Sequence, residues 1–405
     1  MGQEIEIVAF HFSVTRLVVL AGFARVLMKH ERIAGGMQPL DRVMLFWAVG
    51  MLVSGFFHKD PMAAIVLRLG MAYECLGLYF LFRVFVQDLE DFRRITRMLC
   101  VLMIPVAATM LIEMETGRNS FAAVFGGDTE VDYRHGHYRA RGPFVHAILA
   151  GTIGAVCLPM AMLLWPKERK LALAGMAAAG GIVVASGSSG PVMTVLTILA
   201  AMGLWMVRTH IKAIRWSAVA LIILLDLMMN DPVYYLMAKI DITGGSTGWH
   251  RAELIRAAIE HFNGWWLVGT DYTRDWMPTG IYANSDQTDI TNHFLAMGVI
   301  GGLPLLGLFV WVMVAAFSAV GRTLRLWAEA PAGQRFMMWT LGAIMFGHVT
   351  TFMSISYFGQ AITFLYMQLA CIGSLQTFQP AVAVVETGKA AGTAEVYEPD
   401  YCKSC

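Results

Sequence analysis

The sequence predicts an all-α protein that crosses a membrane many times. Hydrophobic residues make up 57% of its 405 residues and charged residues only 15%, whereas soluble domains carry about a quarter charged residues. Mean hydropathy is +0.58. Apolar runs of about 16–24 residues recur, and this is the length that a helix needs to cross about 30 Å of hydrocarbon. The strand alternation that a membrane barrel requires is not visible. We therefore expect a polytopic transmembrane helical bundle.

About eleven apolar runs are candidate membrane spans. The first is interrupted by Arg16 and Arg25, so it could cross the membrane or lie in the interface as an amphipathic helix. The later runs are apolar enough to be read as crossings. The predicted spans are residues 5–28, 43–57, 63–86, 98–112, 145–165, 171–186, 192–207, 216–229, 292–320, 336–355 and 358–378.

Polar stretches divide the chain into one membrane domain, two long loops and a tail. The membrane domain covers residues 1–378, with loop 1 predicted at about 113–143 and loop 2 at about 230–290. Residues 379–405 lack a long apolar run and are predicted to be a disordered tail. The tail holds a CxxC pair, Cys402 and Cys405, for which we expect no function.

Lysine and arginine residues alternate between successive connections, which predicts the orientation of the chain. The short connections without a long loop carry one lysine, Lys59, or none. Because cytoplasmic loops are enriched in lysine and arginine, the basic connections and the C-terminus are predicted to be cytoplasmic. Both long loops and the turn SGSSGP (186–191) then lie on the outer side. The basic connections contain Lys29, Arg32 and Arg42; Arg93, Arg94 and Arg97; Lys167, Arg169 and Lys170; Arg208, Lys212 and Arg215; and Arg322, Arg325 and Arg335.

The segment RARGPFVH (139–146) follows loop 1 and could bind an anion where the chain enters the membrane. Guanidinium groups match phosphate oxygens in shape and stay charged at any pH. Arg139 and Arg141 are therefore candidates for a phosphate-binding pair, with His146 a secondary candidate. The alternative is that both arginines extend toward lipid headgroups at the end of a span.

Loop 2 contains GWHRAELIRAAIEHF (248–262), whose apolar residues have helical spacing. Ser246 and Thr247 could cap this helix, and its first turn would favour an anion near Arg251. Arg256 is a further candidate, and His250 a secondary one. The alternative is a solvated amphipathic helix in which glutamates compensate the arginines.

A third polar group, SDQTDITNHF (285–294), comes directly before an apolar span. His293 could act as a general base or bind phosphate as a cation, and Asp289 could orient it if the two side chains approach. Asn292 is a secondary candidate. The Asp286–Asp289 spacing also permits a metal, but no third ligand is evident, so we expect no metal site.

The sequence contains no motif for nucleotide hydrolysis or for a proton relay. There is no P-loop, which argues against nucleotide hydrolysis, and no charged residue recurs through successive spans as in a proton relay. His348 and Gln360, in or near the last spans, could serve a function or hydrogen-bond between helices. The net charge of +1 gives no indication of a nucleic-acid partner, and none is expected.

Four segments together resemble the O-antigen ligase and polysaccharide polymerase superfamily over roughly residues 60–375. They are RARGPFVHAILAG (139–151), SGSSGP (186–191), GWHRAELIRAA (248–258) and TNHFLAMGVIGGLPLLGLF (291–309). Ligases of this family have a His-Asn pair about eleven residues before the glycine of the last segment, where this chain has Gln287. Its histidine is His293, five residues before Gly298, which is more similar to the exopolysaccharide-polymerase branch.

The resemblance implies a GT-C-like, metal-independent inverting glycosyltransferase without a cofactor, in the bacterial inner membrane, with periplasmic long loops. Its donor would be a glycan on undecaprenyl diphosphate, and other polysaccharide assembly proteins could be partners. By position, Arg141 and Arg251 would bind the diphosphate, with Arg139 a second candidate.

Together these observations predict a polymerase of surface or exported polysaccharide. The nearest alternative is a ligase that moves a finished glycan to a lipid or protein acceptor. A transporter of lipid-linked glycans, which should show paired interrupted helices, and a non-catalytic assembly subunit are alternatives from other classes.

Overall fold

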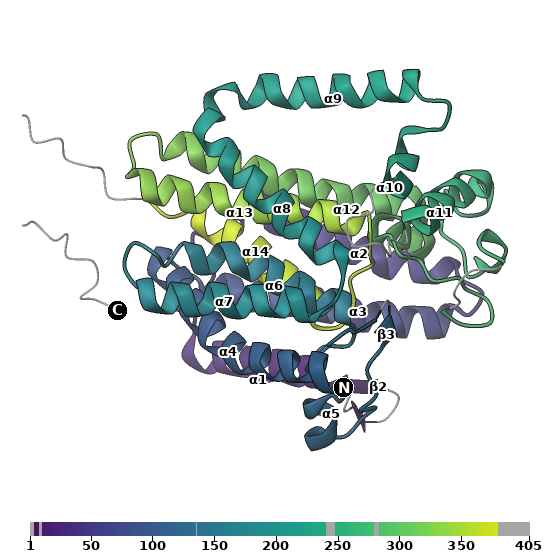
Figure 1. Ribbon diagram of the computed structural model, residues 1–405, viewed down its shortest axis with the longest axis horizontal. Coiled ribbons are helices and arrows are strands. Elements are labelled where there is room, and N and C mark those ends of the chain that lie inside the picture. The colour runs from purple at the N-terminus through teal and green to yellow at the C-terminus, as the bar shows by residue number, and fades with distance from the viewer. Residues whose placement is uncertain (1–3, 8–9, 135, 240–247, 279–282, 380–405) are drawn as a thin grey trace, which may run out of the picture.

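The computed structural model describes residues 4–7, 10–134, 136–239, 248–278 and 283–379. Most of them form helices that run along the long axis of one bundle (Figure 1). The strands in the described residues form two short hairpins, β1 (Glu4–Ile7) with β2 (Phe10–Ser13) and β3 (Tyr133–Arg134) with β4 (His137–Tyr138). The predicted tail and its cysteine pair lie outside the described residues.

Each predicted span contains a helix, which confirms the all-α prediction. Five helical segments are long and apolar enough to cross a membrane: Pro39–Phe57, Pro61–Phe85, Leu89–Thr116, Ser189–Met228 and His293–Leu326. The count of about eleven crossings stays a prediction. The helices are α1 (Val14–Lys29), α2 (Pro39–Ser54), α3 (Pro61–Phe85), α4 (Leu89–Thr116), α6 (Ala147–Met162), α7 (Arg169–Ala185), α8 (Ser189–Gly203), α9 (Ile211–Met228), α12 (His293–Leu326), α13 (Ala332–Phe352) and α14 (Gln360–Leu375).

The first apolar run differs from its prediction, because its beginning is a β-hairpin rather than helix. Helix α1 begins only at Val14, where the Ser13 side chain accepts a hydrogen bond from the Arg16 N–H and caps the helix. The remaining 16 residues span about 24 Å, which is less than a full hydrocarbon core.

The two ends of the bundle carry different elements and connections. One end, called here the loop end, carries α5 (Ser120–Phe125), the β3–β4 hairpin, α10 (Leu236–Lys239) and α11 (Gly248–Glu260). In Figure 1, α10 and α11 lie at the right and α5 lies at the bottom. The opposite end, called here the basic end, carries the connections α3–α4, α6–α7 and α12–α13. Short 3-10 turns at Val233–Tyr235, Phe262–Gly264 and Arg274–Trp276 complete loop 2.

A buried ion pair holds three helices together at the basic end. The Arg83 guanidinium of α3 donates to the Asp41 carboxylate of α2 at 2.9 Å and to the Ser374 hydroxyl of α14 at 2.8 Å. Both charged side chains are fully buried. The Tyr79 hydroxyl donates to the same carboxylate at 2.6 Å. The pair is therefore fully hydrogen-bonded, as a buried charge must be.

Helix α9 differs from the other long helices because none of its residues is buried. It stands apart from the bundle in Figure 1, and its exposed side chains are mainly large and apolar, such as Trp216, Ile223 and Leu227.

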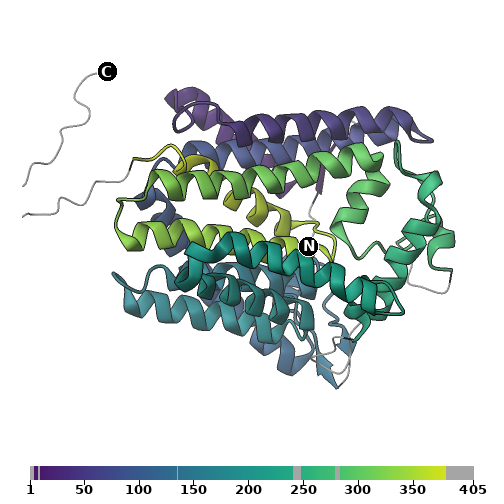
Figure 2. The same cartoon turned by 90° about the horizontal axis from the view of Figure 1, so that it is seen from above.

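Helix α12 is interrupted, a feature that the sequence analysis did not predict. Gly301 and Gly302 leave the helical region, with φ/ψ of −157°/25° and 69°/−169°. The left-handed φ of Gly302 is one that side chains other than glycine rarely adopt. Pro304 follows and has no N–H for the Ile300 carbonyl. Figure 2 shows the short first piece of α12 set at an angle to the long second piece.

Loop 2 and His58 supply the hydrogen bonds that the interruption removes. The Thr270 N–H donates to the Val299 carbonyl at 2.9 Å, and the Leu303 N–H donates to the Trp266 carbonyl at 2.7 Å. The His58 Nε2 atom lies 2.8 Å from the Ile300 carbonyl. Unpaired backbone groups are costly in an apolar setting, so these bonds fix loop 2 against α12.

His58 also bonds to Asp271 of loop 2. Its Nδ1 atom lies 2.6 Å from Asp271 Oδ1, and the Lys59 N–H donates to Oδ2 at 2.7 Å. The His58 ring therefore lies between two acceptors, the Asp271 carboxylate and the Ile300 carbonyl. Partial burial raises the pKa of Asp271, but the Lys59 N–H and His58 outweigh it and hold the pKa below its usual value.

The contacts of Asp271 predict that the stability difference between wild type and Asp271→Asn depends on pH. Because the folded pKa of Asp271 is lowered, its stabilising effect is complete above the unfolded pKa of about 3.9 and is lost as the pH falls through the folded value. We expect Asp271→Asn to lower the melting temperature in detergent at pH 6, and the difference from wild type to shrink as the pH falls below about 3.9. Equal melting temperatures at pH 6 would show that the carboxylate does not anchor loop 2.

Candidate functional site

A buried carboxylate shapes the end of loop 1. Glu113, at the end of α4, accepts hydrogen bonds from the N–H groups of Arg141 and Gly142, each at 2.9 Å. The Asn119 amide donates to Glu113 at 3.2 Å and to the Gly142 carbonyl at 2.8 Å. Glu113 is 1% exposed, so this carboxylate fixes the backbone of the RARGP segment from inside the fold.

The RARGP segment packs against the SGSSGP turn. The Ala140 N–H donates to the Ala185 carbonyl at 2.9 Å, and the Arg139 guanidinium donates to the Ser188 hydroxyl at 2.8 Å. Gly187 has a left-handed φ of 55°, and a Cβ there would lie 3.1 Å from Arg139 Cγ. Two of the sequence motifs therefore meet at the loop end.

Helix α11 brings Arg251 to the loop end by packing its apolar side on α12. Leu254 and Ala258 are buried against Trp265, Trp276 and Val299. Arg251 is half-buried on this same side, since residues three and seven apart share a helix face. Of the predicted apolar positions, Ile259 is exposed instead. Ser246 and Thr247, the predicted caps, lie outside the described residues.

Arg134 of loop 1 lies close enough to Arg139 and to Arg251 of loop 2 to affect the pKa of each. Burial, followed by the charge of Arg134, lowers the pKa of Arg139. Burial and the charge of Arg134 also lower the pKa of Arg251. The Arg251 Nε atom is buried and has no hydrogen-bond partner among the described residues, and the same holds for His250 Nε2. We call Arg134, Arg139 and Arg251 the arginine cluster.

The other two candidate arginines have protein partners. Arg141 donates to the Asp128 carbonyl at 2.8 Å, with the Asp128 carboxylate 3.9 Å away. Arg256 is exposed and paired along its own helix with Glu253 at 2.6 Å and Glu260 at 3.0 Å. Arg256 therefore lies on the solvated side of α11, opposite the side that carries Arg251.

His146 and Asp289 lie near this cluster. His146 caps α6, where its Nδ1 accepts the Ile148 N–H at 3.1 Å. Burial, followed by the charge of Arg139, lowers its pKa, while Asp132 and Asp289 act in the opposite direction. With Nδ1 accepting, the neutral ring carries its proton on Nε2 and can donate it in a hydrogen bond.

His293 lies elsewhere, enclosed by aromatic rings. It is 2% exposed, and the rings of Phe309, Phe352 and Tyr357 lie within 5.7 Å of its own, centroid to centroid. Its Nδ1 accepts the Tyr357 N–H at 3.2 Å. In the part of the chain that the structure describes, no hydrogen bond or ion pair joins it to Asp289. Asn292 caps α12 by accepting the Leu295 N–H at 3.1 Å.

The sequence analysis missed Arg134, Glu113 and Asn119. Arg134 follows an acidic stretch, 128–132, of the kind found in solvated loops, and its hairpin carries too few apolar residues to predict. Glu113 directly follows the predicted span 98–112, where a carboxylate suggests a helix boundary rather than an acceptor. The signal that could have indicated this contact is an asparagine, Asn119, six residues after a glutamate at the membrane edge.

The last-span polar residues are hydrogen-bonded between helices or to loops. His348 Nδ1 lies 2.8 Å from the Tyr357 hydroxyl and its Nε2 contacts Gln368, while Gln360 donates to the Pro143 carbonyl at 3.2 Å. The Gln360–Pro143 bond joins segments 217 residues apart.

We predict that Glu113→Gln loosens loop 1. A glutamine has one acceptor oxygen, so one of the N–H groups of Arg141 and Gly142 would lose its partner, at a cost of about 1–3 kcal/mol. Limited proteolysis should cleave loop 1 faster than in wild type, and the melting temperature should fall.

The matched control is Glu115→Gln, which removes a charge from an exposed position two residues later. It should leave both measurements unchanged. If Glu113→Gln also leaves cleavage of loop 1 unchanged, Glu113 does not organise the segment.

Across the described residues, no group of three or more His, Cys, Asp or Glu side chains could hold a metal ion. No protein-family model matches the chain, and no curated protein matches it. Functional inference therefore depends on the motifs and on the geometry that brings them together.

Proposed function

We propose that the chain is a membrane glycosyltransferase that uses a glycan linked to undecaprenyl diphosphate, most simply as a polysaccharide polymerase. The arginine cluster is the observation that carries this proposal. Its cations come from two loops distant in sequence, and the buried Nε of Arg251 lacks a partner among the described residues. Arg139 and Arg251 are half-buried and lie near the exposed Arg134. These like charges repel one another, and an anionic ligand would relieve this cost.

The chemistry of the transfer accounts for the cluster. When an acceptor hydroxyl attacks the anomeric carbon, the bond to the diphosphate breaks and negative charge develops on the leaving oxygen. Guanidinium donors fixed in advance stabilise that charge, more strongly where water is scarce. Arg139, held by Ser188 at 2.8 Å, is positioned in this way.

We assign different roles to His146, Asp289 and His293. His146, with Nε2–H free to donate, would hydrogen-bond to the diphosphate or to the glycan. Asp289, half-buried and close enough to affect the pKa of His146, would accept the proton of the acceptor hydroxyl. His293 would instead support the packing around α12, because aromatic rings enclose it. A ligase would need the same anion site and differs only in its acceptor.

One observation favours a transporter of lipid-linked glycans, namely the interruption of α12, since broken helices line transport sites. In such sites the unwound carbonyls are available to a substrate or ion. Here the carbonyls of Val299 and Ile300 are occupied by Thr270 and His58. The interruption therefore serves better as an anchor for loop 2, and the glycosyltransferase is the preferred function.

The test is complementation of a strain lacking this gene with Arg134→Ala, Arg139→Ala and Arg251→Ala. Each should reduce polymer formation at least about a hundredfold, the effect of removing one donor to a developing oxyanion. Arg251→Lys should restore only part of the activity, because lysine keeps the charge but not the paired donors. Arg256→Ala should retain activity, since Arg256 bonds to carboxylates of its own helix.

The products separate the alternatives, provided that a blot shows normal amounts of each variant in the membrane. Accumulated single repeats on the carrier indicate a polymerase, whereas long chains that stay on the carrier indicate a ligase. Single repeats confined to the inner leaflet indicate a transporter. Normal polymer from all three alanine variants would refute the arginine cluster as the diphosphate site.

A further inference from the structure

A cavity lies at the basic end, away from the arginine cluster. Its volume is about 730 Å³, within the range of about 300–1,000 Å³ that small-molecule sites occupy. The α6–α7 connection forms one wall, and residues of α7, α8 and α13 form the others. Nothing in the proposed transfer reaction uses this cavity.

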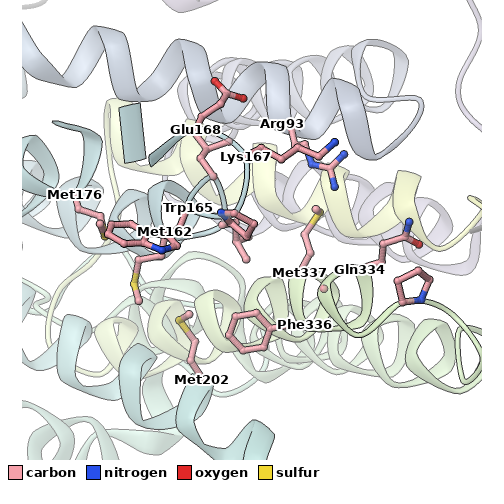
Figure 3. A pocket seen from close by; sticks show the side chains of 15 residues that line it. Arg93, Met162, Trp165, Lys167, Glu168, Met176, Met202, Gln334, Phe336 and Met337 are labelled. Carbon is pink, nitrogen blue, oxygen red and sulfur yellow. The ribbon is translucent and has the colours of Figure 1, made fainter. Parts of the chain in front are cut away.

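The interior of the cavity is apolar and rich in methionine. Met162, Met176, Met202, Phe336 and Met337 line it, and Figure 3 shows these side chains converging from several helices. Methionine is unbranched and flexible, so it packs well against a chain without fixed shape. A long hydrocarbon chain fits such walls better than a polar metabolite does.

The mouth of the cavity is positively charged. Arg93 and Lys167 lie together along one edge in Figure 3, beside Glu168. Glu168 is already neutralised by Arg97, which bonds to it at 2.6 Å. Lys167 has no ion pair within the described ranges. Arg93 has only a long contact of 3.4 Å to Glu90, a carboxylate that Arg97 also uses at 2.8 Å.

One further polar atom lies in this lining without a partner. The amide oxygen of Gln334 is buried and accepts no hydrogen bond from any residue that the structure describes. An acceptor of this kind needs a donor from a ligand or water, such as a hydroxyl. The cavity thus offers an apolar interior, two cations at its edge and one free acceptor.

We propose that this cavity binds one anionic phospholipid of the phosphatidylglycerol type. An acyl chain lies among the methionines, Arg93 and Lys167 hold the phosphate, and the Gln334 oxygen accepts a hydrogen bond from a glycerol hydroxyl. Basic pockets between membrane helices bind anionic headgroups in this way. Charge complementarity selects this lipid over a neutral one, and the apolar interior selects a lipid over free phosphate.

The test is native mass spectrometry of the purified full-length protein in detergent, titrated with dioleoyl phosphatidylglycerol and, separately, dioleoyl phosphatidylcholine. One phosphatidylglycerol should bind more tightly than all others, and phosphatidylcholine should not reproduce this site. Removing both cations in Arg93→Gln/Lys167→Gln should weaken it about 25-fold, since each basic residue contributes about fivefold. Met202→Trp or Met176→Trp should abolish it by filling the cavity while the charge is unchanged.

Lys212→Gln/Arg215→Gln is the matched control, because it removes two cations from another basic connection that does not line the cavity. It should leave the tight site intact. The proposal fails if this control weakens binding as much as Arg93→Gln/Lys167→Gln, or if phosphatidylcholine binds equally well. It also fails if both tryptophan variants, monodisperse on a sizing column, keep the tightly bound lipid.

Discussion

The structure depends on one constraint, that backbone groups released inside an apolar bundle must find hydrogen-bond partners. Gly301, Gly302 and Pro304 break the hydrogen bonding of α12, and the released groups bond to Trp266, Thr270 and His58. Loop 2 is therefore tied to the helix bundle at the break itself. Because α11 packs on the first piece of α12, the same constraint decides where Arg251 lies.

Loop 1 is also held by hydrogen bonds to its backbone groups. Here the main partner is a buried side chain, whereas loop 2 bonds to a broken helix. Glu113 accepts the N–H groups at the turn after Arg139, and Ala140 bonds to the carbonyl before SGSSGP. Both loops are thus fixed to rigid helices, which suits a site that must be organised before its ligand arrives. These anchors hold the arginine cluster in place despite the repulsion between its charges, and a bound anion would reduce that repulsion.

The two ends of the bundle serve different purposes in this interpretation. The loop end combines cations from distant segments with a histidine and a carboxylate, a set of groups suited to reaction. The basic end combines the buried Arg83–Asp41 pair with a methionine-lined cavity, a set suited to stability and to contact with lipid. This separation would keep the proposed lipid site apart from the proposed diphosphate site, so that the two anions would not compete for the same cations.

The sequence by itself determined where the helices lie, because the length and hydropathy of a span are local properties of the chain. It also determined which motifs carry arginine. Only the tertiary structure decided that Arg134 approaches both Arg139 and Arg251, that Arg256 faces its own glutamates and that aromatic rings enclose His293. The hairpin before α1 and the break in α12 escaped prediction too. Such features depend on contacts between segments far apart in sequence, and hydropathy contains no information about which side of a helix meets which loop.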